Sequence, residues 1–218
     1  VERVRGALSD ESSFVGAAAA ELAGERGRTG LRPDLTAAFA RFLSGAPKND
    51  KGCKAKIALA SALHRMGLED AALFRQGLRY RQPEPGWGGS QDSAAELRGI
   101  CALAISYSGG VDAVEELADV LADPEAATRA LCARALGASG RSDAVPLLRY
   151  KLRIGDPANE VLLECCAGLL SLCAGRALLL LAAVLERPEE SGSEAASAAA
   201  TALPGVWTLC QLANTSSA

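Results

Sequence analysis

Three pairs of oppositely charged residues recur in this chain with a spacing of six positions: Asp50 and Lys56, Asp92 and Arg98, and Asp123 and Arg129. We call these six residues the ladder. A row of cations can bind phosphate or carboxylate groups through charge-assisted hydrogen bonds. Alternatively, each cation hydrogen-bonds an Asp or a carbonyl of its own or the neighbouring repeat. The structural interpretation is favoured, because every cation comes with an Asp at the same offset.

The cysteines are the other residues whose chemistry needs a decision. The chain has seven, an odd number, and they lie inside apolar helical patterns rather than at the spacings of a disulfide framework. Cys165, Cys166 and Cys173 are close in sequence, but no histidine is near and there is no CxxC motif. Cys101 and Cys132 occupy a position that Leu or Ala fills in other repeats. We therefore expect reduced, buried thiols, no metal site, no cofactor and no catalytic residue.

The ladder recurs because the chain is built from repeats. The segment DPEAATRALCARALGASGRSDAVPLL, residues 123–148, contains an alanine-rich helix, a glycine turn and the start of another helix. A glycine follows each ladder cation at the same interval, at Gly67, Gly109 and Gly140, and such glycines end helices. Gly27 takes the same place in the first repeat, where Gly16 replaces the cation. The pattern fades toward both ends, as in terminal repeats of an array.

Helices with larger apolar residues alternate with the alanine-rich ones. Their apolar side chains recur at intervals of three and four. Asp123 and Asp156 each precede a proline, and we expect Asp to be the N-cap with Pro at the first helical position. Two repeat intervals are longer than a helix pair requires, and the extra residues are placed in insertions at 24–33 and 82–91. Their Gly, Pro and charged residues are expected to interrupt the helices.

These patterns predict an all-α fold, an α-solenoid of about five to six antiparallel helix pairs in a right-handed superhelix. The abundance of Ala and Leu, in place of Val, Ile and aromatics, favours helix over sheet. We expect one repeat domain over residues 1–218. Its repeats are expected at about 1–27, 28–67, 68–109, 110–140, 141–174 and 175–207, with a tail at 208–218.

The segment at 123–148 resembles the HEAT repeat, in the bacterial form named after phycobilisome lyases. The resemblance is strong over residues 92–155 and weaker toward the ends, and it implies second helices that line a concave face. It does not imply lyase activity, because function resides in sites added to a scaffold. Residues 74–99 are also similar to a segment of bacterial HEAT-repeat proteins of unassigned function. HEAT-type deoxyhypusine hydroxylases hold iron through His-Glu pairs, whereas His64 is the one histidine here and Arg65 follows it.

The insertion QPEPGWGGSQ, residues 82–91, contains residues that a helical repeat does not need for its own packing. Trp87 lies among prolines and glycines, and the residues just before it have the composition of a binding hot spot. The candidate partner-binding residues are Trp87, Arg79, Tyr80, Arg81, Glu84 and Arg98. The alternative is that Trp87 folds back and covers the groove between adjacent repeats.

The charge pattern gives little support for nucleic acid or an acidic membrane as partner. The net charge is -3, which creates no global attraction to polyanions. Three local basic groups are interpreted by default as solvated faces: Lys48, Lys51, Lys54 and Lys56; Arg75, Arg79 and Arg81; and Arg149, Lys151 and Arg153.

The longest apolar run, residues 177–185, is too short to cross a bilayer, and no signal-peptide pattern is found. We therefore expect a cytoplasmic protein.

The expected function is a non-catalytic scaffold that binds a protein or peptide partner through its concave face and the Trp87 loop. The alternatives are an auxiliary subunit of a lyase-type modifying complex and a nucleic-acid-binding HEAT protein.

Overall fold

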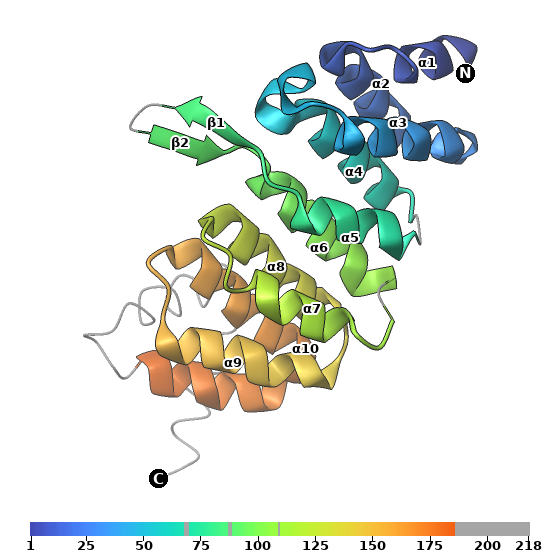
Figure 1. Ribbon diagram of the computed structural model, residues 1–218. Coiled ribbons are helices and arrows are strands. Elements are labelled where there is room, and N and C mark those ends of the chain that lie inside the picture. Colours follow the sequence, from blue (N-terminus) through green and yellow to red (C-terminus); the bar gives the residue numbers. More distant parts are fainter. Residues whose placement is uncertain (68–69, 87–88, 109, 186–218) are drawn as a thin grey trace. The chain divides into compact units, whose positions relative to one another are not determined.

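The computed structural model describes residues 1–67, 70–86, 89–108 and 110–185 (Figure 1). Nearly all regular structure in these ranges is helical. The helices are α1 (Glu2–Leu8), α2 (Ser13–Glu25), α3 (Arg32–Ser44), α4 (Lys54–Arg65), α5 (Ala71–Arg79), α6 (Ala95–Ser108), α7 (Ala113–Val120), α8 (Ala126–Ala138), α9 (Val145–Ile154) and α10 (Asn159–Leu185). Strands β1 (Pro83–Gly86) and β2 (Gly89–Asp92) form an antiparallel hairpin.

The chain forms two compact units, Val1–Ala113 and Val114–Ala218. In the first unit, α2 packs on α4 and α4 on α6, while α1, α3 and α5 form a second layer against them. In the described part of the second unit, α8 packs on α10, and α9 contacts both. Helix pairs therefore stack in layers within each unit, and the predicted all-α solenoid fold is confirmed. The right-handed superhelical sense stays a prediction.

Small residues bring the second helices of the pairs together. A Cβ atom added at Gly24 of α2 would lie 3.1 Å from the Cα atom of Ala62 in α4. The first helices contribute larger side chains. Phe39 of α3 and Phe74 of α5 are fully buried, with ring centroids 6.3 Å apart. Burial of one such side chain contributes roughly 1.5–3 kcal/mol, so the alternation of small and large residues builds the core between the layers.

Glycines end the helices where the sequence predicts. Gly27, Gly67 and Gly140 have φ angles of 55°, 64° and 68°, a left-handed conformation that glycine adopts without steric cost. Gly109 lies outside the described residues. Where Cys173 replaces the glycine, α10 continues across a kink with φ -153° and ψ 53°. This kink separates two helical segments of α10 and lies beside the expected repeat boundary between residues 174 and 175.

The predicted N-caps are wrong for α8 and α10, which begin three residues after Asp123 and Asp156 respectively. Each Asp accepts a hydrogen bond from the backbone amide two residues ahead, Glu125 N or Ala158 N, at 2.9 Å. This geometry is an Asx turn that precedes the helix. A side-chain N-cap is found instead at Asp70, whose Oδ1 accepts from Leu73 N at 3.1 Å.

Both insertions are more regular than expected. Helix α2 extends to Glu25 and α3 begins at Arg32 with proline in its first turn, so residues 24–33 are helical at both ends. The hairpin occupies the second insertion, and the prolines of β1 are tolerated because a two-stranded sheet consists of edge strands. Trp87 lies outside the described residues, so its role as a contact or a plug stays a prediction.

Candidate functional site

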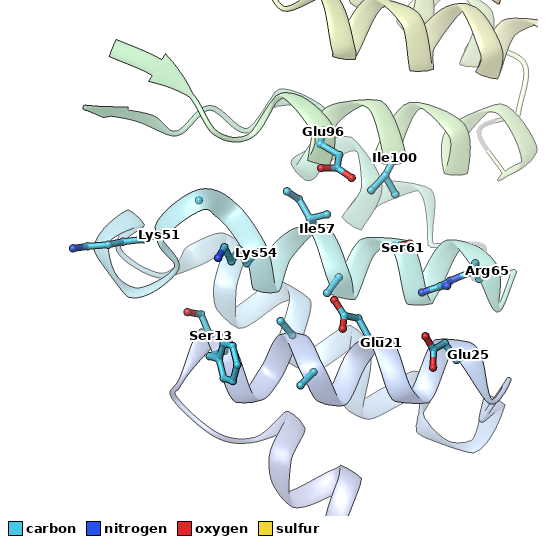
Figure 2. A pocket seen from close by; sticks show the side chains of 15 residues that line it. Ser13, Glu21, Glu25, Lys51, Lys54, Ile57, Ser61, Arg65, Glu96 and Ile100 are labelled. Atoms are coloured by element: carbon cyan, nitrogen blue, oxygen red, sulfur yellow. The ribbon is translucent and has the colours of Figure 1, made fainter. Parts of the chain in front are cut away.

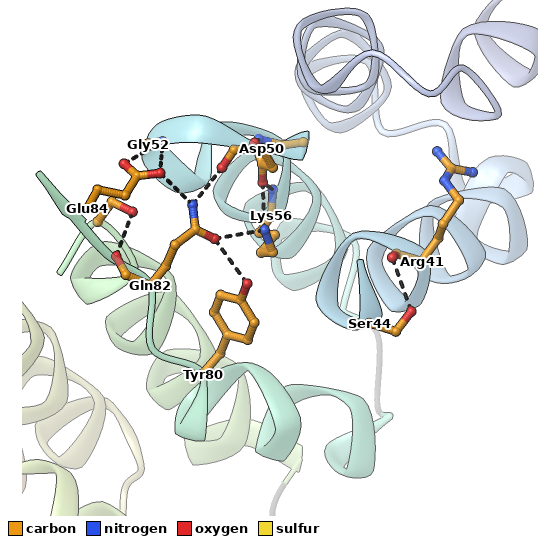
Figure 3. Close-up of polar contacts among 10 residues, drawn as sticks. Arg41, Ser44, Asp50, Gly52, Lys56, Tyr80, Gln82 and Glu84 are labelled. Atoms are coloured by element: carbon orange, nitrogen blue, oxygen red, sulfur yellow. Dashed lines mark hydrogen bonds and ion pairs between the residues drawn. The ribbon is translucent and has the colours of Figure 1, made fainter. Parts of the chain in front are cut away.

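A buried polar network joins the first ladder pair to the hairpin (Figure 3). Lys56 is fully buried, and its Nζ lies 3.2 Å from Asp50 Oδ2 and donates to Gln82 Oε1 at 3.1 Å. Asp50 also accepts from the backbone amides of Ala55 and Lys56 at 2.9 and 3.1 Å. Tyr80 donates its hydroxyl to Gln82 Oε1 at 3.0 Å, and its ring centroid is 5.0 Å from the Lys56 ammonium. Lys56 is therefore held inside the fold.

Gln82 connects two ladder pairs and was missed by sequence reasoning. Its side chain donates to the Asp50 carbonyl at 2.6 Å and to Glu84 Oε1 at 2.9 Å, and its backbone amide donates to Asp92 Oδ1 at 2.9 Å. Lys56 has one terminal nitrogen where the other ladder cations have a guanidinium fork. The buried side-chain amide of Gln82 supplies additional hydrogen bonds, to Lys56 Nζ and to the Asp50 carbonyl. One sequence feature could have pointed to Gln82. Lys56 stands where the other ladder pairs have Arg, and the insertion at residues 82–91 follows in the next repeat.

The other two ladder cations are also hydrogen-bonded within the fold. Arg98 Nη1 donates to Asp92 Oδ2 at 2.6 Å and to the Tyr80 carbonyl at 3.1 Å. Arg129 donates to the Asp123 carbonyl at 2.8 Å and, through Nε and Nη2, to both carboxylate oxygens of Asp156 at 2.7 Å.

Lys151 adds a second cation to Asp156, with Nζ 2.8 Å from Oδ2. Burial raises the pKa of Asp156, but the hydrogen bonds from Arg129 and Lys151 outweigh burial and bring the pKa to about 2. The solvated-face interpretation is therefore wrong for Lys56 and Lys151. Lys48, Arg149 and Arg153 are exposed.

Five of the six predicted partner-binding residues are described by the structure and fall into two groups, while Trp87 lies outside the described residues. Tyr80, Glu84 and Arg98 have partners inside the first unit. Glu84 accepts from Gly52 N at 3.0 and 2.9 Å, and its hydrogen bond from Gln82 is the main cause of its lowered pKa. Arg79 and Arg81 are exposed, and Arg81 Nη1 lies 3.5 Å from Asp92 Oδ2. For all of these residues, partner binding stays a prediction.

A groove of about 880 Å³ lies on the second-helix face of the first unit, between α2, α4 and the start of α6 (Figure 2). We call it the α2–α4–α6 groove. Its floor consists of small and aliphatic residues: Ala17, Ala18, Ile57, Ala58, Ser61 and Ile100. At one end lies Phe14, whose side chain is largely exposed at 78%.

Charged residues form the rim of this groove. They are Glu21 and Glu25 of α2, Lys51, Lys54 and Arg65 in and just before α4, and Glu96 of α6. Among the residues that the structure describes, the side chains of these six form no hydrogen bond or ion pair. The ladder cations, in contrast, are all hydrogen-bonded. The rim charges therefore remain available to a ligand.

Five of the cysteines, Cys53, Cys101, Cys132, Cys165 and Cys166, are buried and poorly ionised. Burial raises the pKa of Cys53, Cys165 and Cys166 to about 12, and it also raises the pKa of Cys101 and Cys132. Because the thiolate is the nucleophile and metal ligand, such thiols are unreactive at neutral pH. Groups of three or more His, Cys, Asp or Glu placed to hold a metal are absent from the described ranges.

Comparisons with known proteins give a distant structural likeness and no family. No protein-family model matches the chain, and no curated protein matches it. Among solved structures, the chain is similar to human deoxyhypusine hydroxylase in complex with glycerol, with 19% identity and a TM-score of 0.42. The alignment covers 90% of this chain and 81% of that chain. None of the helices within the described ranges has the length and apolar character of a membrane span.

Proposed function

We propose that the protein is a non-catalytic scaffold that binds a protein or peptide partner in the α2–α4–α6 groove. One observation supports this proposal most strongly. The ladder cations are hydrogen-bonded within the fold, whereas the six rim charges of the groove have no side-chain partner in the described part of the chain. The groove thus combines an apolar floor with charged groups that can select a partner.

The rim specifies the chemistry of that partner. Glu21 and Glu25 lie one helical turn apart, so they match two basic residues one turn apart on a helical segment. Lys51 and Lys54 lie toward the other end of the groove, beside the start of α2 (Figure 2), and match an acidic residue. Small apolar side chains of the partner would pack on the alanine floor, and a larger one would contact Phe14.

We include in this proposal three features that the sequence predicts. They are a HEAT-like repeat of the bacterial lyase-named kind, a cytoplasmic location, and the Trp87 loop as a second contact with the partner. The ladder positions the groove, because Asp50 holds the amides at the start of α4 and so fixes the helix that forms the groove floor.

The experiment is affinity capture from the native organism with four versions of the full chain, followed by mass spectrometry. Ala18→Trp fills the groove from an exposed position of α2, and Lys54→Glu reverses a rim charge. Arg28→Glu is the matched control, because Arg28 is an exposed cation of the first unit outside the groove. We expect the wild type and the control to retain a protein that both groove variants lose. An identical set of proteins on all four would contradict the proposal.

A further inference from the structure

A second pocket, of about 390 Å³, lies in the second unit against α9 and α10. Arg149 and Arg153 of α9 are one helical turn apart and share a face. Arg176 comes from α10, which packs on α9. Tyr150 and Val145 contribute an aromatic and an aliphatic side chain to the wall of the pocket.

The three guanidinium groups are exposed, and within the described residues none of them forms an ion pair or hydrogen bond. Two acids of the same region are already paired. Asp156 is held by Arg129 and Lys151, and Asp143 by Arg141 at 2.6 Å. The three arginines therefore line one pocket, and these two acids are engaged by other cations.

We propose that this pocket binds a phosphate monoester carried on a phosphorylated side chain of a protein partner. A phosphate monoester is close to a dianion at neutral pH and has three strong acceptor oxygens. Guanidinium forks bind such oxygens in pairs. Tyr150 is 66% exposed, and with Val145 it offers a surface for the carbon skeleton that carries the phosphate. An aromatic phosphate, as in phosphotyrosine, fits this wall best.

A single-stranded nucleic acid fits this pocket less well. Its binding needs cations that follow the backbone and several aromatic platforms for successive bases. This pocket has one aromatic residue, and its 390 Å³ suit a single side chain. The whole chain has a net charge of -3, which does not attract a long polyanion. The site is separate from the α2–α4–α6 groove and is tested independently of it.

The test is isothermal titration calorimetry of the full chain with phenyl phosphate and with inorganic phosphate. We expect both to bind, and phenyl phosphate to bind more tightly because its ring contacts Tyr150. Arg149→Gln and Arg153→Gln should each weaken binding of both probes about tenfold, the loss expected for a charge-assisted hydrogen bond. Arg28→Gln is the control for the loss of one exposed positive charge and should bind both probes as the wild type does.

Tyr150→Ala tests the aromatic part of the proposal. It should remove the preference for phenyl phosphate and leave the binding of inorganic phosphate unchanged. A preference that survives in this variant overturns the choice of an aromatic phosphate. Absence of phosphate binding, or equal binding by the wild type and the two arginine variants, overturns the site itself. If a thymidine oligonucleotide binds more tightly than phenyl phosphate and both arginine variants lose it, the ligand is nucleic acid and the proposal fails.

Discussion

Arg129 and Asp156 lie 27 residues apart in the chain and are joined by two parallel hydrogen bonds of 2.7 Å. Both side chains are buried. Bidentate contacts between a guanidinium and a carboxylate are the strong form of the ion pair, because geometry and charge act together. In the second unit the ladder therefore joins one repeat to the next, from the first turn of α8 to the turn before α10.

Replacement of Arg129 by methionine should destabilise the protein by about 2–4 kcal/mol, because the buried Asp156 carboxylate loses its bidentate partner and retains Lys151 and the Ala158 amide. Urea unfolding followed by circular dichroism measures the change. Arg134→Met is the matched control: Arg134 also pairs with an acid of α10, Glu164, but its side chain is 56% exposed. Exposed pairs contribute under about 1 kcal/mol. Equal losses of unfolding free energy in the two variants would show that the buried pair contributes no more stability than the exposed pair.

The same pair gives a pH dependence with a definite sign. The pKa of Asp156 falls from 3.8 to about 2 on folding, so its contribution is present above about pH 4 and is lost as the pH falls toward 2. We expect roughly 2 kcal/mol of unfolding free energy to disappear across this window. In Arg129→Met the pKa of Asp156 rises and the loss becomes smaller. Parallel curves of urea midpoint against pH for the two proteins would contradict the assignment.

Gln82→Met should destabilise the first unit by about 1–3 kcal/mol, because Lys56 and the Asp50 carbonyl each lose a buried hydrogen-bond partner. Thermal unfolding compares it with Gln76→Met, a change at an exposed position of α5, which should have little effect. If both variants unfold at the same temperature, the buried network does not stabilise the unit and the hairpin is not anchored through Gln82.

Local and long-range features differed in how well the sequence predicted them. Gly27, Gly67 and Gly140 were predictable because a helix end depends on the φ angle of one residue. Gln82 was not, because its role depends on Asp50, which lies 32 residues away. The α2–α4–α6 groove was not predictable in detail either, since its residues come from three helices and only packing brings them to one face. For Arg98 the choice between partner and structure depends on burial, which the sequence pattern does not report.

Two glycines set the distance between α8 and α10. A Cβ atom added at Gly168 would lie 2.9 Å from Leu148 Cδ1 and 3.0 Å from Gly137 Cα, so Gly168→Ala forces the helices apart. We expect a loss of about 1–3 kcal/mol, the usual cost of overpacking. Gly175→Ala, in α10 just after the kink at Cys173 and with no atom of a packed neighbour within 4 Å of the added Cβ, should instead stabilise by up to about 1 kcal/mol. If urea unfolding shows that both variants change the free energy of unfolding in the same direction, the close packing assigned to Gly168 is contradicted.

The claim that the α2–α4–α6 groove binds the partner is tested most directly by site-specific photo-crosslinking. A benzophenone amino acid is placed at Ala18 in the groove or at Arg28 outside it, each in the full chain within its native cells. We expect a defined protein to crosslink to position 18 and not to position 28, and Lys54→Glu to abolish the product at 18. A product at position 28 with none at 18 would contradict binding in the groove.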